Sequence, residues 1–434
     1  MKINQKQLYN WAKDIYPIHR SLTGEGVRKT LSYIKKIIPN LKIKSIPTGK
    51  KVFGWTVPME WSINDAYVKD SKGKKVIDFK KNNLHIVNYS SPVRTKLNLK
   101  DLKKRIYSLK NQPKAIPYIT SYYSKRWGFC ISDEKLKKLK NDIYEVVIES
   151  SFKKGFLNYG EIIIPGKSKE EILISTNICH PSMGNNETSG IVVAAGLAKC
   201  ISELKNRRYT YRIIFIPETI GSIAYIYLNK NKLKKRVKAG FVVVCVGDEK
   251  TYSFLSSRES NTLSDRAALY ALNKYIKKFN YYDFLERGSD ERQFCSPGID
   301  LPICSIMRSK YGTYPEYHTS LDNLQFISGK GLYGSFEILK KTLEILEINF
   351  TYKNIYNSLC EPKLSNFNLR PPISFKKSYD YDKNLLNILL YADGKRDLIE
   401  LSNKVKVDIF EVNKIANRLV KSKLLKKLSK KNGK

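Results

Sequence analysis

The chain has 434 residues, of which 42% are hydrophobic and 12% aromatic, which is enough apolar surface for more than one packed core and excludes a disordered protein. It contains no run of about 18 apolar residues, and its N-terminus lacks the apolar core of a signal peptide, so we expect a cytoplasmic protein without a membrane span. A net charge of +39 is typical of proteins that bind nucleic acids. Because the lysines are spread along the chain with abundant Ile and Asn, residues that share AT-rich codons, we interpret most of the charge as compositional.

The N-terminal third of the chain predicts two different kinds of structure. Within the first 45 residues, apolar residues recur at helical spacing on both sides of the Ser-Leu-Thr-Gly break at 21–24, which predicts two helices. Residues 51–154 instead contain short alternating stretches, such as KVIDF and YEVVIES, separated by Gly, Pro and Asn. This pattern predicts a small β-rich domain inserted into the chain.

Residues 155–350 alternate between strand and helix patterns. Four apolar runs predict buried strands (EEILISTNI, YRIIFIP, AGFVVVCVGD and DLPICSIMR), and long amphipathic stretches lie between and after them. Such alternation is typical of an α/β fold with a mostly parallel sheet and helices on both faces. We expect residues 1–50 and 155–365 to form this domain together.

Residues 375–434 predict a winged helix-turn-helix domain after a linker that contains Pro371 and Pro372. Three short helical patterns follow, and Asp397 and Asp408 are expected N-caps. The last fourteen residues contain seven lysines and no acid, which would suit phosphate contacts. Since Asp408 and Glu411 at the start of the last helix would repel phosphates, a role in protein interaction or packing is the favoured interpretation over sequence-specific DNA binding.

Four residues with metal-binding or acid–base chemistry follow the predicted strands. His180, Glu218 and Asp248 each come shortly after a strand, and His318 lies in the loop after the fourth. In an open α/β sheet, the carboxyl ends of the strands meet at one edge, where ligands bind. Histidine and carboxylate are the ligands of a hydrolytic zinc site, although each residue alone would also suit a cap, a turn or the core.

The sequences around these residues resemble a known family. NICHPSMGNNETSG, IPETIGS, CVGD, GSDERQF and EYHTSLDN resemble the strand-end motifs of zinc aminopeptidases of the co-catalytic di-zinc type. YPIHRSLTGEGVRKTL, WTVPMEWSINDAYV and PYITSYYSKRWGFC extend a closer resemblance over nearly the whole chain. That closer match is to bacterial aminopeptidase-like proteins with an inserted small domain and a C-terminal winged helix, which are described as peptidases or polysaccharide-biosynthesis proteins.

The resemblance implies roles for individual residues. His180 resembles a ligand of the first metal, Asp248 its carboxylate partner, and His318 a ligand of the second metal. Glu218 matches the general base that takes a proton from water, and Tyr317 resembles a tyrosine that stabilises the tetrahedral oxyanion.

An acidic pair lies where the family has an acidic residue near the site. Asp290 and Glu291 would bind a substrate ammonium or form a structural ion pair with Arg287 or Arg292.

Two departures from the family pattern concern the metals. Asn186 takes the place of the metal-bridging Asp, and a neutral amide bridges two cations poorly. Thr219 takes the place of the second Glu. We therefore predict one zinc ion at most, with Glu218 drawn into its coordination.

The leading hypothesis is a metal-dependent hydrolase that cleaves an amide bond in a small peptide or a glycan-related substrate through metal-activated water. Asn186 and Thr219 support one alternative, a catalytically degenerate protein that binds a ligand. The charge and the C-terminal helices support another, a nucleic-acid-binding regulator. The sequence leaves open whether the chain forms a homo-oligomer.

Overall fold

The computed structural model describes residues 3–356, 360–369 and 376–428. The chain divides into two compact units, one of residues 1–265 and 276–339 and the other of residues 266–275 and 340–434. The predicted Pro-Pro linker and the last six residues of the lysine-rich end lie outside the described residues. Among the described helices, none is long and apolar enough to cross a membrane.

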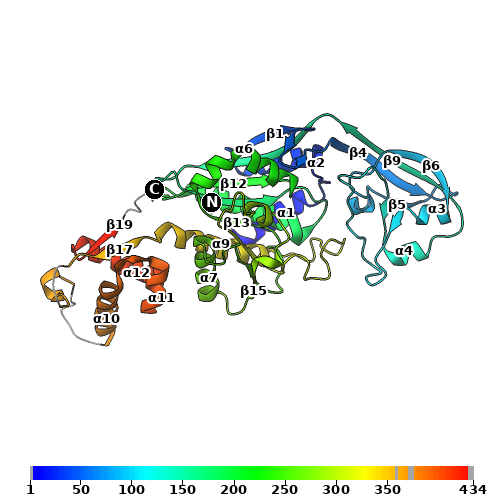
Figure 1. Cartoon of the computed structure of the whole chain (residues 1–434). Coiled ribbons are helices and arrows are strands. Elements are labelled where there is room, and N and C mark those ends of the chain that lie inside the picture. The colour runs from blue at the N-terminus through cyan, green and yellow to red at the C-terminus, as the bar shows by residue number, and fades with distance from the viewer. Residues whose placement is uncertain (1–2, 357–359, 370–375, 429–434) are drawn as a thin grey trace. The chain divides into compact units, whose positions relative to one another are not determined.

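The first unit is built on an eight-stranded sheet (Figure 1). Its order is β1 (Lys42–Pro47), β10 (Phe156–Ile164), β12 (Thr210–Ile216), β11 (Glu171–Asn177), β13 (Val237–Val242), β16 (Ile303–Met307), β14 (Ser253–Leu255) and β15 (Asn280–Tyr282). The four strands predicted from the sequence are the four central ones, and they run parallel to one another. Antiparallel pairings flank them, between β10 and β12 and between β14 and β16. The predicted mostly parallel α/β sheet is confirmed.

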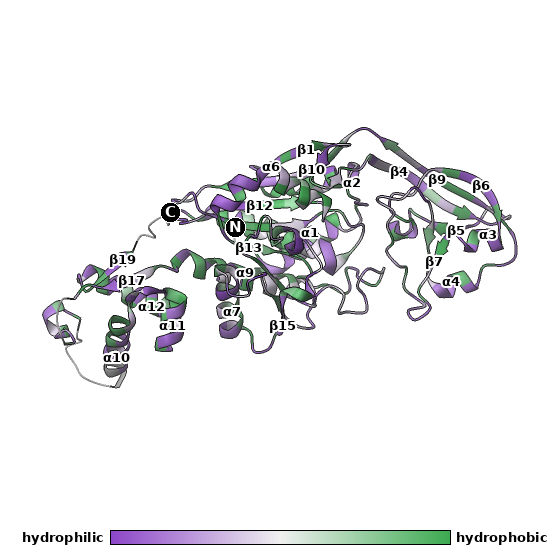
Figure 2. Cartoon of the chain, viewed as in Figure 1, coloured by the Kyte–Doolittle hydropathy of each residue, from purple (hydrophilic) through white to green (hydrophobic). Residues whose placement is uncertain are grey.

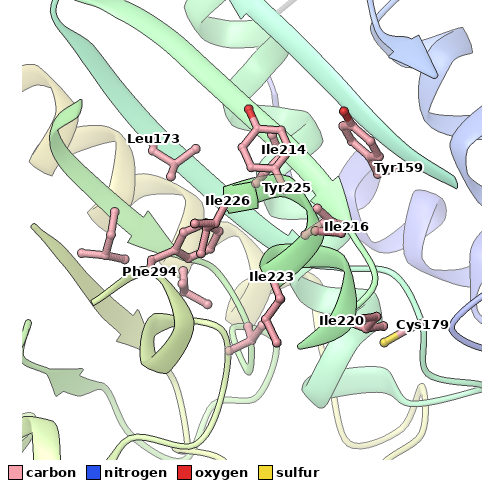
Figure 3. Packing of buried hydrophobic residues seen from close by; sticks show 14 of the residues in the cluster. Tyr159, Leu173, Cys179, Ile214, Ile216, Ile220, Ile223, Tyr225, Ile226 and Phe294 are labelled. Carbon is pink, nitrogen blue, oxygen red and sulfur yellow. The ribbon is translucent and has the colours of Figure 1, made fainter. Parts of the chain in front are cut away.

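Helices cover this sheet because its strands carry apolar residues on both faces. All seven residues of β11 are buried, as expected for a central parallel strand. Ile220, Ile223 and Ile226 of α6 pack with Ile214 and Leu173 of the sheet in one buried cluster (Figure 3). The helices that lie wholly or partly in this unit are α1 (Gln5–Ile15), α2 (Glu25–Ile37), α5 (Ser189–Glu203), α6 (Ile220–Arg236), α7 (Leu263–Tyr275), α8 (Glu291–Phe294) and α9 (Gly329–Ile348).

A second, smaller sheet lies in the segment predicted to be β-rich. Its four strands are antiparallel, in the order β5 (Lys75–Asp78), β4 (Glu60–Lys69), β9 (Ile143–Lys153) and β6 (Val93–Asn98). It has an apolar core of its own, and Figure 2 shows polar and apolar residues mixed along its strands. Around it lie the hairpin β2 (Lys51–Val52) and β3 (Trp55–Thr56), the pair β7 (Ile106–Tyr107) and β8 (Phe129–Cys130), and the helices α3 (Leu99–Lys103) and α4 (Asp133–Lys137).

The second unit contains the winged helix. Its helices α10 (Lys376–Tyr391), α11 (Leu398–Val405) and α12 (Ile409–Lys421) accompany a sheet of β18 (Asp393–Asp397), β17 (Thr351–Asn354) and β19 (Leu425–Leu428). The predicted N-caps are confirmed: Asp397 caps α11 in a capping box with Glu400, and Asp408 caps α12. The last of the three helical patterns, DIFEVNKIANRLVKSKLLKKL, predicts a helix as far as residue 428. This prediction is wrong beyond Lys421, because residues 425–428 pair with β17 as a strand.

Candidate active site

The structure brings three of the four strand-end residues together at one edge of the sheet. His180 follows β11, Glu218 lies between β12 and α6, and His318 lies in the loop after β16. The ring centroids of His180 and His318 are 5.5 Å apart. The carboxylate oxygen Oε2 of Glu218 lies 3.7 Å from Nε2 of His180. These side chains therefore form one cluster, as their positions in the sequence predicted.

Glu187 fixes the orientation of His180. Its oxygen Oε2 accepts hydrogen bonds from His180 Nδ1 at 2.5 Å, the His180 backbone at 2.7 Å and the Cys179 backbone at 2.8 Å. Its other oxygen accepts from Nε of Arg20 at 3.0 Å, and both of these charged side chains are fully buried. Burial lowers the pKa of His180, but the charge of Glu187, its hydrogen bond to the ring and the charge of Glu218 together outweigh burial, so the His180 pKa is raised. With Nδ1 engaged, Nε2 is the nitrogen that faces Glu218.

His318 presents a nitrogen without a partner. Its Nε2 is buried and forms no hydrogen bond with any residue that the structure describes. Burial, followed by the charge of His180, lowers the His318 pKa to about 3, so the ring is neutral and one nitrogen keeps its lone pair. The residue has a left-handed backbone (φ 55°), which is uncommon outside glycine and concentrates at functional sites.

The turn before α5 carries Asn186, and Asp322 organises this turn. The backbone amides of Asn185 and Asn186 donate to Asp322 at 2.5 and 2.9 Å. Gly184 is required here, because a Cβ atom would lie 2.5 Å from the carbonyl oxygen of Asn323. The buried amide oxygen of Asn186 has no hydrogen-bond partner in the described part of the chain.

The Asn186 side chain lies near a thiol and a phenol. Its amide nitrogen lies 3.8 Å from Sγ of Cys245, which is also 3.8 Å from the hydroxyl of Tyr314. Burial raises the Cys245 pKa, so this thiol keeps its proton. An amide, a thiol and a phenol would hold a divalent cation poorly.

Asp248 is not brought into the histidine cluster. Its oxygens accept hydrogen bonds from the backbone and hydroxyl of Ser309, both at 2.9 Å, from the backbone of Lys250 at 2.8 Å and from the side chain of Asn185 at 2.9 Å. These contacts use its acceptor capacity to join two loops. In this structure Asp248 forms hydrogen bonds to these loops, and the ligand role that the resemblance implied stays a prediction.

The acidic pair, Asp290 and Glu291, accepts hydrogen bonds from backbone and hydroxyl groups near the site. Asp290 accepts hydrogen bonds from the Thr219 backbone and the Ser222 hydroxyl, both at 2.8 Å, and burial, followed by the charge of Glu218, raises its pKa to about 8. Glu291 accepts from the backbone amides of Gly288 and Ser289 at 2.9 Å. Within the described residues, neither acid forms an ion pair, and the expected pairing with an arginine is not found.

A cavity of about 330 Å³ opens beside the histidines. Four aromatic side chains line it, together with His180, His318 and a single acid, Glu218; the aromatic residues are Trp55, Tyr118, Tyr122 and Tyr123. The ring centroid of Tyr118 is 5.2 Å from that of each histidine, and its hydroxyl lies 2.7 Å from that of Tyr122. Tyr118 is also held by backbone pairing, since its amide donates to the carbonyl of His318 at 2.8 Å.

Some of these residues were not assigned a role from the sequence. The three tyrosines come from PYITSYYSKRWGFC, whose tyrosine density marks an aromatic surface without indicating what it faces. Tyr317, which was assigned the oxyanion role, stacks on His318 with ring centroids 3.9 Å apart and is not among the residues that line the cavity. Tyr118, in contrast, is among the lining residues, and the oxyanion role of Tyr317 stays a prediction.

Comparison with known proteins places the chain in a family. A family described as a domain of unknown function (DUF4910) matches residues 9–349, and one described as winged helix-turn-helix matches residues 351–427. The chain belongs to the DUF4910 family. A protein of Clostridium acetobutylicum named "Putative polysaccharide biosynthesis protein with aminopeptidase-like domain" is 42% identical over 421 residues, which is 97% of this chain and 96% of that protein.

Solved structures show the same relationship for the fold of this DUF4910 chain. A crystal structure described as a "putative peptidase" from Clostridium acetobutylicum is 41% identical, with a TM-score of 0.91 over 98% of this chain and 96% of that one. A zinc aminopeptidase from Bacillus subtilis is 13% identical, with a TM-score of 0.58 over 78% of this chain and 94% of that one. The latter likeness shows the aminopeptidase-like fold alone.

Two groups of side chains in this DUF4910 chain offer metal-donor atoms. The donor atoms of Cys179, His180 and Glu187 lie within 4.8 Å of one another, but Glu187 already accepts from Arg20 and two backbone amides. Burial also raises the pKa of the Cys179 thiol, which therefore keeps its proton. On the opposite side of the His180 ring, Nε2 lies 3.7 Å from Oε2 of Glu218, and the ring centroid of His318 is 5.5 Å from that of His180.

Proposed function

We propose that this chain is a zinc-dependent hydrolase with a single metal site formed by His180, Glu218 and His318. Two imidazoles and one carboxylate, with one position left for water, form a common ligand set of catalytic zinc. The unpartnered Nε2 of His318 is the observation that carries this assignment. A bound zinc ion would polarise an amide carbonyl and lower the pKa of a water molecule.

The surroundings of the three ligands support the same assignment. Glu187 holds His180 as the carboxylate partner of a metal-binding histidine usually does. The hydroxyl of Ser289 donates to Oε1 of Glu218 at 2.9 Å, which leaves Oε2 facing His180. Because Asp248 is engaged elsewhere, Glu218 is the carboxylate that completes the set.

The substrate that suits this cavity is a small neutral amide, and we propose an N-acylated, glycan-related compound. An aminopeptidase must bind a free ammonium group, which needs a carboxylate, and the only acid lining this cavity among the described residues is the proposed ligand Glu218. One oxygen of Asp290 and one of Glu291 accept hydrogen bonds from backbone amides, and neither residue lines this cavity. Aromatic walls suit an uncharged ring with an apolar face.

Tyr118 is proposed to stabilise the oxyanion that forms at the attacked carbonyl. A hydroxyl placed at such an oxygen and shielded from water acts where charge develops. The neighbouring hydroxyl of Tyr122 lies at 2.7 Å and can orient it.

Zinc content tests the metal site. After incubation with zinc, untagged protein should retain about one zinc per chain by mass spectrometry, and His180→Asn, Glu218→Gln and His318→Gln should each lose it because three protein ligands are needed. His85→Gln is the matched control, since His85 is a buried histidine that bonds to the Cys130 carbonyl instead. Less than about 0.2 zinc per chain in the unaltered protein would overturn the metal assignment.

Substrate class is tested with two kinds of amide. Release of acetate from N-acetylated amino sugars should exceed release of nitroaniline from amino-acid nitroanilides, because the cavity lacks a free acid for an ammonium group. A preference for the amino-acid substrates would overturn the neutral-amide assignment. If neither class is hydrolysed by the unaltered chain but Asn186→Asp creates activity, the degenerate alternative holds.

A further inference from the structure

A second cavity, of about 540 Å³, adjoins the first. Trp55 lines both cavities. The first cavity reaches Ile220 at the start of α6, and the second reaches Ile223 and Ile226 along the same helix. The two cavities thus lie along the first turns of one helix and share Trp55 in their linings, so a single elongated ligand can reach both.

The lining of the second cavity combines flat apolar rings with positive charge. Phe53 and Trp55, at the end of the β2–β3 hairpin, are 56% and 41% exposed. Lys230 and Lys234 lie on α6, and the structure shows no carboxylate among the described lining residues. Neither lysine forms an ion pair within the described ranges, although Lys234 donates to the carbonyl of Gly298 at 3.3 Å. Lys234 interacts electrostatically with Asp300, which itself pairs with Arg258 outside the lining, and no described acid lines the cavity beside the two lysines. This positive lining favours an anionic ligand.

Phe53 is held in a conformation that a large residue rarely adopts. Its φ of 53° is left-handed, a position that two-residue hairpin turns usually give to Asn, Asp or Gly. Its ring meets that of Tyr227 edge to face, with centroids 5.3 Å apart. Strain of this kind is typical of binding sites, and here it keeps an aromatic ring exposed at the edge of the cavity.

Amide and hydroxyl groups complete the lining. Asn231, Gln293 and Ser296 offer hydrogen bonds, while Ile223, Ile226 and Ile299 form the apolar part. Nucleotides are recognised by this combination of groups: an aromatic ring stacks on the base, lysines bind the phosphates, and amides form hydrogen bonds with hydroxyl groups or base edges.

We propose that the second cavity binds the nucleoside diphosphate of a nucleotide-activated sugar, whose N-acyl group extends past Trp55 to His180 and His318. This inference rests on the proposed function, because it supplies the remainder of the same glycan-related substrate. The base stacks on Phe53 and Trp55, and the phosphates meet Lys230 and Lys234.

Calorimetric titration with ADP, CDP, GDP and UDP tests the site at 0.15 M salt, where the Debye length of about 8 Å suppresses binding to diffuse charge. At least one diphosphate should bind, and the matching nucleoside and inorganic pyrophosphate should each bind at least about tenfold more weakly, because each lacks half of the contacts. The affinity for the diphosphate should fall by about tenfold in each of three variants, Lys230→Gln, Lys234→Gln and Phe53→Ala.

Lys232→Gln is the matched control, because Lys232 lies on α6 between the two lysines but does not line the cavity. Equal weakening by Lys232→Gln, pyrophosphate binding as tight as that of the diphosphate, or no binding at millimolar concentration would overturn the inference. The titration needs neither zinc nor turnover. A chain that binds zinc but no nucleotide refutes this inference alone, and one that binds nucleotide but no zinc refutes the proposed function alone.

Discussion

Replacing Glu187 with Gln should weaken zinc binding and destabilise the first unit at the same time. The carboxylate accepts four hydrogen bonds, including those from His180 Nδ1 and Arg20 Nε. Without its charge, Arg20 is left buried and unpaired, and breaking a buried ion pair costs about 3–5 kcal/mol. Since Glu187 also holds the ring of a proposed ligand, we expect zinc affinity to fall by about 10–100-fold, as for other partners of metal-binding histidines.

The assay separates these two effects. Competition with a chromophoric chelator gives the zinc affinity, and urea unfolding of the metal-free protein gives the stability. Glu171→Gln is the matched control, because Glu171 is equally buried and pairs with the buried Arg212. That control should lose stability but keep its zinc affinity. If Glu187→Gln weakens zinc binding no more than Glu171→Gln does, the reasoning about His180 is refuted.

Three further changes test other parts of the structure. Tyr118→Phe should lower turnover of an N-acyl substrate by about 100-fold with zinc retained, whereas Tyr317→Phe should leave turnover nearly unchanged; steady-state kinetics showing the reverse would favour Tyr317 as the oxyanion residue. Burial raises the Asp322 pKa to about 7 from an ordinary value of 3.8, so the folded chain holds a proton that the unfolded chain loses, and stability should fall as pH rises through this window. Asp322→Asn should flatten that slope in urea midpoints measured between pH 4 and 7, and an unchanged slope would assign it to other groups. Asp397→Ala should lower the stability of the winged helix by about 1 kcal/mol through loss of the cap, and Asp397→Asn, which keeps an acceptor, should cost less in thermal unfolding; equal losses would argue against the capping explanation.

The central sheet and the histidine pair could be predicted from the sequence because both follow from local patterns. Apolar runs of strand length predicted the four parallel strands, and the parallel topology predicted that His180 and His318 lie at one edge of the sheet. The last two strands of the sheet, β14 and the edge strand β15, have three residues each, which is too short for a strand pattern to be recognised. The last helical pattern failed at residue 425 because a Leu-Lys-Lys-Leu stretch fits a helix as well as a strand until its pairing partner is known.

The finer features of the site depended on contacts between distant residues. Asp248 has the right chemistry and follows a strand, but its partner Ser309 lies 61 residues away, so these hydrogen bonds could not be predicted from local patterns. The role of Glu187 could not be predicted, because its pairing with Arg20 spans 167 residues. The tyrosines of the cavity wall belong to the β-rich segment. The periodicity of the sequence could not indicate that this segment contacts His318.

The backbone pairing between residues 116–118 and 318–320 has a consequence for how this family can diversify. Tyr118 donates to the carbonyl of His318, and Ser320 donates to the carbonyl of Ile116. These backbone hydrogen bonds thus join the segment that shapes the cavity wall to the segment that carries a proposed zinc ligand. A loop transplanted from a relative to change substrate preference would pull on His318 as well, so new specificities should arise more readily from single side-chain exchanges at Tyr122 and Tyr123 than from wholesale loop replacement.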